Sequence, residues 1–256
     1  MSASLGEFLV GLAWGAVASV GLVVGAVVGS LSRLSHQKIA VAMSVGAGLL
    51  LAAASLELAA DAIRIAGAGQ AVMSLLLGAA VLSVGNAILA RFGAAHRKRC
   101  GECTQQPSES QHPGSGVAIA LGTALDAVPE ALVLGIALWE PAVPLELVIA
   151  IAVGNLSEAL SGAAGMRFAN RSHRYILLLW SAIAIGATVA TAIGFVTFGS
   201  LGQSWTPHLK AFGAGALLAM TAETMIPEAF HNSPRFSGFV AAIGFCVVLL
   251  AEAAMH

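Results

Sequence analysis

Long apolar stretches follow one another along almost the whole chain, and short polar connections separate them. A helix that crosses the hydrocarbon core of a bilayer needs about 20 mostly apolar residues. Eight stretches meet that need, and they cover residues 8–29, 38–60, 68–90, 115–139, 144–166, 175–198, 209–230 and 236–255. The pattern predicts an all-α integral membrane protein with eight transmembrane helices, in a single transmembrane domain over residues 1–256.

The composition excludes a water-soluble enzyme. Charged residues make up 10% of the chain and hydrophobic residues 58%, whereas about 25% of the residues of a soluble domain are charged. A net charge of −1 without an extended basic face also excludes a nucleic-acid-binding protein. The 29 glycines favour close packing of membrane helices. We expect a multi-pass protein in the lipid bilayer of the plasma membrane, or of the inner membrane if the source is bacterial.

Lys and Arg residues are divided unequally between the two sides of the predicted bundle. If the N-terminus lies outside, the inner connections contain ten of them: Arg33, Lys38, Arg91, Arg97, Lys98, Arg99, Arg167, Arg171, Arg174 and Arg235. The outer side contains only Arg64 and Lys210. Because cytoplasmic loops carry the excess of Lys and Arg, the distribution predicts that both termini lie outside.

The longest polar connection covers residues 91–114, between the third and fourth predicted helices. Its polar composition, with Pro, Ser and Gly, predicts a mobile cytosolic loop. The loop contains His96, Cys100, Cys103 and His112, which supply the nitrogen and sulfur ligands that zinc prefers. The alternative is an unstructured loop in which these residues occur incidentally, and their spacing leaves both interpretations open.

Acidic residues occupy the middle of the fourth and fifth predicted helices. Asp126 and Glu130 are four residues apart and share one helix face, and Asn155 lies three residues before Glu158. A charged side chain at mid-bilayer costs about 2.5–3.5 kcal/mol on insertion scales. Carboxylate and amide oxygens are also the ligands of divalent metal ions. The cluster indicates a metal site between the two helices; the alternative is a set of protonated acids that hydrogen-bond to neighbouring helices.

Four further acids lie toward helix ends. Glu57 and Asp61 are at the outer end of the second predicted helix, and Glu223 and Glu228 are toward the inner end of the seventh. They are candidates for vestibules on either side of the metal site. The alternative is that they are solvated residues of the membrane interface.

Short internal similarities accompany these acids. The segment 128–132 (V-P-E-A-L) in the fourth predicted helix is similar to 156–160 (L-S-E-A-L) in the fifth. Pro129 and Pro227 each remove a helical N–H and leave a carbonyl free to bind a side chain, water or an ion. A 3+2+3 arrangement with an inverted repeat would relate the paired segments, and such repeats are typical of transporters.

Three of these segments resemble motifs of the ZIP (ZRT/IRT-like) family of divalent metal transporters. Residues 126–131 (D-A-V-P-E-A) are similar to the family's H-N-x-P-E-G in helix 4, and residues 154–159 (G-N-L-S-E-A) to its (H/Q)-(N/D)-x-x-E-G in helix 5. Residues 223–229 (E-T-M-I-P-E-A) are similar to an acidic-Pro-Glu-Ala stretch in helix 7. The eight helices, outward termini and variable loop between helices 3 and 4 also match the family.

The resemblance implies a metal centre that Glu130 and Glu158 bridge. Asp126 would complete one metal site and Asn155 would complete a second. Asp126, Ala127 and Gly154 stand where the family has His, Asn, and His or Gln. A site with oxygen ligands alone favours harder ions such as manganese, iron or magnesium over zinc, so the identity and number of the metals stay open.

The function expected from the residues and the resemblance is import of divalent metal cations into the cytosol. The metal is cargo, and we expect neither a resident cofactor nor catalysis. The direction comes from the resemblance alone, so efflux or metal/proton exchange is an alternative. An intramembrane enzyme is a further alternative, although Asp126 has no second Asp at its depth. The sequence leaves the oligomeric state open, and a homodimer is one of the alternatives.

Overall fold

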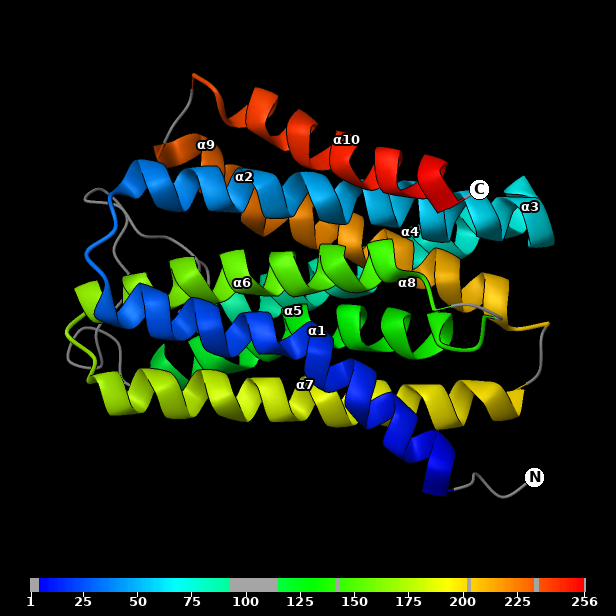
Figure 1. Ribbon diagram of the computed structural model, residues 1–256, viewed down its shortest axis with the longest axis horizontal. Coiled ribbons are helices and arrows are strands. Elements are labelled where there is room, and N and C mark those ends of the chain that lie inside the picture. Colours follow the sequence, from blue (N-terminus) through cyan, green and yellow to red (C-terminus); the bar gives the residue numbers. More distant parts are fainter. Residues whose placement is uncertain (1–4, 93–114, 141–142, 202–203, 233–234, 256) are drawn as a thin grey trace.

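A computed structural model describes residues 5–92, 115–140, 143–201, 204–232 and 235–255. These residues form helices, and no strand occurs among them. The α-helices are α1 (Leu5–Leu31), α2 (His36–Ala52), α3 (Asp61–Ala66), α4 (Ala68–Ala90), α5 (Ser115–Ala137), α6 (Leu145–Phe168), α7 (His173–Leu201), α8 (Thr206–Met220), α9 (Ile226–Asn232) and α10 (Ser237–Met255). Figure 1 shows them aligned along one long axis, with the start of α1 and the end of α10 at the same end of the bundle.

Eight helical segments are long and apolar enough to cross a membrane. They are Leu5–Leu31, His36–Ala66, Ala68–Ala90, Ile119–Ala137, Leu145–Phe168, His173–Phe198, Thr206–His231 and Ser237–Ala254. The prediction of an eight-helix membrane protein is therefore confirmed. The second segment extends beyond the predicted residue 60 because α3 continues the helix to Ala66.

The second and seventh membrane segments each contain a π-helical turn. Residues Ala53–Ala60 (η1) join α2 to α3, and residues Thr221–Met225 (η3) join α8 to α9. A π-helical turn widens the helix and rotates the side chains that follow, and such turns are frequent at functional sites. Glu57 lies in η1 and Glu223 lies in η3. Pro227 is the second residue of α9, one residue beyond Ile226, so its missing N–H falls in the first turn of that helix.

The helices pack in two groups. In the first group, α1 packs against α6 and α7, and α5 packs against α7. In the second group, α4 packs against α8, and α2 packs against α10. Contacts of α2 with α6 and of α5 with α8 join the groups. Helices α5 and α6 run antiparallel and touch, but α5 has its main contacts with α7, and α6 has its main contacts with α1. The short connection between α5 and α6 does not reveal these partners.

Glycines bring α1 into backbone contact with α6. Gly21, Gly25 and Gly29 recur every fourth residue, and a Cβ atom at these positions would lie 2.1, 2.3 and 2.4 Å from carbonyl oxygens of α6. Gly11 and Gly15 face α7 in the same way, with the nearest backbone atoms at 2.7 and 2.8 Å. In a bilayer, helices associate through such close packing and not through the hydrophobic effect.

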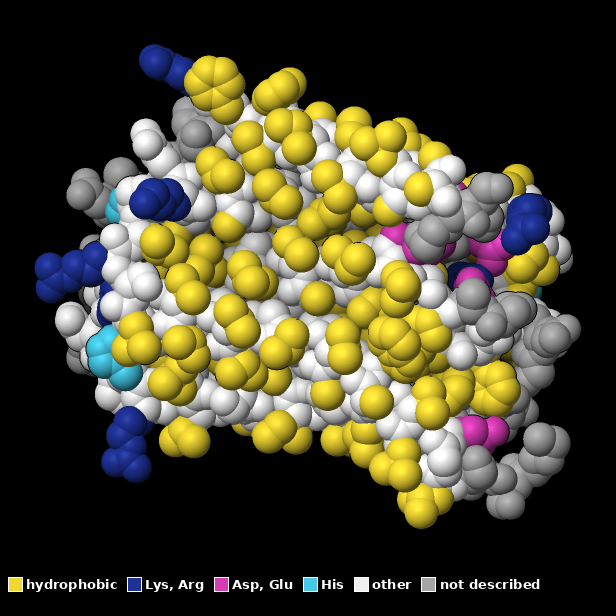
Figure 2. Space-filling view, in the orientation of Figure 1, with side chains coloured by type: hydrophobic (Ala, Val, Ile, Leu, Met, Phe, Trp, Pro, Cys, Tyr) yellow, Lys and Arg dark blue, Asp and Glu magenta, His cyan; other side chains and the backbone are white. Residues whose placement is uncertain are grey.

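Charged side chains separate toward the two ends of the bundle, and apolar side chains cover the region between them (Figure 2). The predicted inner residues that the structure describes all lie at or near helix ends on one side: Arg33, Lys38, Arg91, Arg167, Arg171, Arg174 and Arg235. Arg64 and Lys210 lie at the opposite end, as predicted. Arg97, Lys98 and Arg99 lie outside the described residues. The side of the membrane that each end faces stays a prediction from this distribution.

We predict that Gly25→Ala destabilises the protein by about 1–3 kcal/mol, the usual cost of overpacking. Its added methyl would lie 2.3 Å from the carbonyl oxygen of Leu156, and only separation of α1 from α6 would relieve the overlap. Gly186→Ala in α7 is the matched control, because a Cβ atom there has no neighbour within 4 Å. Thermal unfolding in detergent measures both variants, and equal melting temperatures would contradict the packing described.

Candidate functional site

Polar side chains in the middle of α5 and α6 are buried in the bundle. The exposed fractions are 0% for Asp126, 2% for Glu130, 3% for Asn155 and 1% for Glu158. Asp126 and Glu130 lie in α5 around Pro129, and the other two lie in α6. All four predicted metal-site residues therefore lie in the protein interior. Burial of carboxyl groups at this depth favours either protonation or a nearby cation.

Asn155 connects this region to α1. Its side-chain Nδ2 donates a hydrogen bond to the carbonyl oxygen of Ala18 at 3.1 Å. Its Oδ1 is buried and has no hydrogen-bond partner among the described residues. The bond fixes the orientation of the amide group, and the amide oxygen keeps its capacity to accept a hydrogen bond.

Glu228 brings a further carboxyl group to α6. It is 1% exposed, and its Oε1 lies 3.3 Å from the hydroxyl oxygen of Ser161. Ser161 is three residues after Glu158, so the two side chains share a face of α6. The sequence suggested a vestibule or an interfacial position for Glu228. The structure places it in the protein interior, beside the helix that carries Asn155, and its vestibule role stays a prediction.

The described residues contain no group of three or more His, Cys, Asp or Glu side chains arranged to hold a metal ion. Ala127 packs in an apolar cluster that includes Trp180 and Ile183. A Cβ atom at Gly154 would lie 2.7 Å from Cδ1 of Leu50 in α2, so a larger side chain there would require that leucine to move.

At the acidic end of the bundle, Asp61 is bound by two cations. Lys210 Nζ lies 2.6 Å from Oδ2 of Asp61, and Arg64 pairs with the other carboxylate oxygen. Lys210 also pairs with Glu140, which follows α5. Asp61 thus takes part in an ion-pair network that joins α3, α8 and the end of α5. A carboxylate held by two cations is a poor ligand for a metal ion, which weakens its vestibule assignment.

The other two predicted vestibule residues have separate partners. The carboxyl group of Glu57 lies close to that of Glu146 at the start of α6. Glu223 is exposed and accepts hydrogen bonds from Ser83 and Asn86 of α4, with 2.9 Å between Asn86 Nδ2 and Glu223 Oε2. The two π-helical turns therefore direct one acid toward α6 and the other toward α4.

Several of these partners have no signal in the local sequence. Glu146 lies in the first turn of α6, where acids are common because they interact favourably with the helix dipole. Glu140 and Lys210 lie near helix ends, and Ser161 is a small residue in an apolar helix. Only a tertiary contact distinguishes each of them. The candidate loop ligands His96, Cys100, Cys103 and His112 lie outside the described residues.

Comparison of the chain with models of known protein families found no match, and comparison with curated protein sequences found none either.

We predict that Lys210→Met destabilises the protein by about 2 kcal/mol. Its side chain is 5% exposed. Removal of its ammonium group leaves the partly buried carboxylates of Asp61 and Glu140 without this ion-pair partner. A fully buried pair would lose about 3–5 kcal/mol, and the 36% exposure of Glu140 reduces the cost. Arg64→Met is the control, because the Arg64 side chain is 79% exposed and such pairs contribute about 0–1 kcal/mol. Thermal unfolding that ranks Arg64→Met as the more damaging change would contradict this network.

Proposed function

We propose that the protein transports divalent metal cations across the membrane through the region between α5 and α6. The observation that carries the proposal is the burial of Asp126, Glu130, Glu158 and Glu228 in the interior of a membrane bundle. Ionisable residues within membrane segments are costly and mark ion pathways and proton relays. The similarity of three segments to ZIP motifs supports the same function.

The donor atoms favour hard metal ions. Carboxylate oxygens and the buried Oδ1 of Asn155 are oxygen ligands, which suit manganese, magnesium and iron better than an imidazole-rich site would. Zinc remains within the proposal because carboxylates also bind it. A transported ion must bind weakly enough to leave, and the carboxylates of α5 and α6 would contact it only during its passage.

The charges at the two ends support a direction of entry. The Glu57–Glu146 pair lies at the acidic end, beside the start of α6, where negative charge would attract a cation. Glu228, which belongs to the buried acids, and Glu223 both lie in the part of the seventh segment that approaches the basic end. We propose that metal passes from the Glu57–Glu146 pair to Glu228 and Glu223. The resemblance and the Lys/Arg distribution support a cytosolic position for the basic end.

The two groups of helices support an alternating-access mechanism, in which one group moves against the other. The contact between α1 and α6 corresponds to the contact between α7 and α5. The contact between α4 and α8 corresponds in the same way to that between α10 and α2. We propose that segments 1–3 and 6–8 form the inverted repeats of a 3+2+3 arrangement. This repeat would exchange segment 1 with 6, segment 2 with 7 and segment 3 with 8. The π-helical turns in the second and seventh segments are a further pair that it relates.

Glycine contacts follow the same exchange and support the proposed repeat. A Cβ atom at Gly48 would lie 1.9 Å from the carbonyl oxygen of Ala241, and one at Gly244 would lie 2.5 Å from that of Val45. In the other pair of helices, Gly215 faces the carbonyl of Leu75 and Gly78 faces that of Phe212, each at 1.9 Å. In both pairs of helices, each glycine faces the residue that lies three positions before the glycine of the opposite helix.

The direct test is metal uptake by purified protein in liposomes that contain a metal-sensitive dye. Influx of at least one divalent ion, with protein-free liposomes as the control, is the expected result. Absence of flux for zinc, manganese, iron and magnesium from a folded protein would refute the proposal. A second dye that records internal pH distinguishes simple uptake from metal/proton exchange.

We predict that Glu130→Gln lowers metal uptake at least tenfold, since it removes a buried charge that balances the cation and keeps the side-chain volume. Glu130→Ala is expected to abolish uptake while the protein still inserts. Glu7→Gln, at the start of α1 and away from α5, is the control and retains uptake. Size-exclusion chromatography verifies folding, and wild-type rates in both Glu130 variants would exclude this residue from the pathway.

We predict that Asp126→His shifts selectivity toward zinc, because imidazole is a better ligand for zinc than for magnesium or manganese. Asp126→Asn is the matched control, as it removes the charge without adding a nitrogen ligand. Competition among the ions for uptake measures the shift. An unchanged competition profile in the histidine variant would show that residue 126 does not bind the metal.

A further inference from the structure

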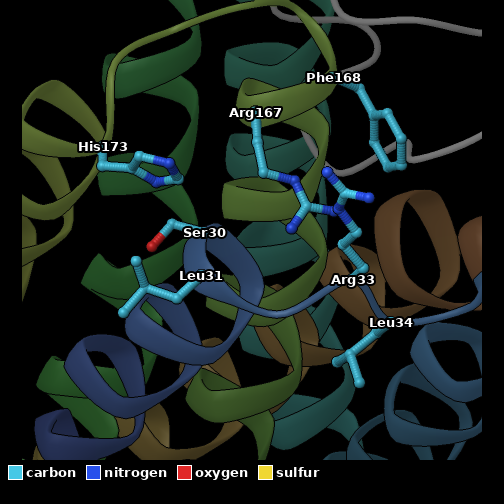
Figure 3. A pocket seen from close by; sticks show the side chains of 7 residues that line it. All are labelled: Ser30, Leu31, Arg33, Leu34, Arg167, Phe168 and His173. Atoms are coloured by element: carbon cyan, nitrogen blue, oxygen red, sulfur yellow. The ribbon is translucent and has the colours of Figure 1, made fainter.

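An open cavity of about 470 Å³ lies at the basic end of the bundle, away from the buried acids. Ser30, Leu31, Arg33, Leu34, Arg167, Phe168 and His173 line it. Figure 3 shows that they come from the end of α1 and its connection to α2, from the end of α6, and from the start of α7. Residues 30–34 therefore form one cavity with residues 167–173, which are distant from them in sequence.

The cavity is cationic. Two guanidinium groups and an imidazole line it, and its lining contains no Asp or Glu. Among the described residues, no ion pair joins Arg33 or Arg167 to a carboxylate. Bringing two like charges to one cavity is unfavourable unless an anion binds between them. The arrangement therefore fits a negatively charged ligand better than a purely structural role.

Arg167 is held in place by its surroundings. Its Nη1 donates a hydrogen bond to the carbonyl oxygen of Ser32, and its guanidinium lies 5.3 Å from the ring centroid of Phe168. The ring of His36 stacks on the same Phe168 ring, with 5.6 Å between the two centroids. An oriented guanidinium presents its planar set of donors to a phosphate group, which it can bind through two parallel hydrogen bonds.

We propose that this cavity binds the phosphate group of an anionic ligand, with Arg33 and Arg167 as its principal ligands. Leu31 and Phe168 are exposed beside it, and the apolar surface of the bundle begins there. Basic pockets between membrane helices on the cytoplasmic side bind anionic lipid headgroups. An anionic phospholipid and free phosphate both supply the required chemistry, and they differ in whether acyl chains contribute.

Binding would tie the two groups of helices together at this end. Arg33 lies in the connection between α1 of the first group and α2 of the second, whereas Arg167 belongs to α6. A phosphate that contacts both arginines would restrain that connection against α6. The ligand should therefore raise the melting temperature of the protein, whether or not metal is transported.

The test uses the full chain in detergent, with native mass spectrometry and thermal unfolding as readouts. Dioleoyl phosphatidylglycerol, the zwitterionic dioleoyl phosphatidylcholine and inorganic phosphate are the probes. Arg33→Gln and the double variant Arg33→Gln/Arg167→Gln are compared with Arg91→Gln. Arg91 is exposed at the same end, follows α4 and does not line the cavity, so it controls for general attraction of anions.

We expect phosphatidylglycerol or phosphate to bind the wild type and raise its melting temperature. Arg33→Gln should weaken binding about tenfold, the effect of losing one charge-assisted contact, while Arg91→Gln leaves it unchanged. Because Arg33 is exposed, this variant remains informative if the double variant fails to fold. Preference for the anionic lipid over phosphate identifies a headgroup site, and equal binding of phosphate identifies a free anion. No binding of any probe, or equal weakening by Arg33→Gln and Arg91→Gln, would overturn the proposal.

Discussion

Close contact between helix backbones is the interaction on which the rest of this structure depends. Apolar side chains gain little by leaving lipid for the bundle interior, so helices must associate through close packing and polar contacts. In this chain, glycines of α1 approach the carbonyl oxygens of α6 and leave no space for a Cβ atom. That contact sets the rotation and depth of α6. The hydrogen bond from Asn155 to Ala18 then fixes the polar face of the same helix.

The polar interior follows from this packing. Once α6 is fixed against α1, Glu158 and Ser161 face the interior, and α9 brings Glu228 to the serine hydroxyl. Helix α5 reaches the same interior from α7 and adds Asp126 and Glu130. The carboxyl groups thus belong to helices that are held mainly by other helices. Such an arrangement leaves α5 and α6 freer to change their separation than tightly packed neighbours would be.

Different chemistry occupies the two ends of the bundle. At the acidic end, Lys210 joins Asp61 to Glu140, and the carboxyl groups of Glu57 and Glu146 lie together. The basic end contains arginines around an open cavity. A cation would be attracted to the first end and an anion to the second. The separation of charge along one axis therefore supports both a direction for cation movement and an independent anion site.

The sequence by itself determined the eight membrane segments, the separation of basic residues and the depth of the acids in α5 and α6. These features depend on composition along one helix, which periodicity and length report directly. Only the tertiary structure decided that Glu228 contacts Ser161, that Asp61 is held by Lys210, and that α5 and α6 pack mainly against other helices. Such contacts join residues far apart in the chain, and many pairings of eight apolar helices satisfy the same local pattern. The choice among them depends on where small residues let two backbones meet, which requires both helices to be placed.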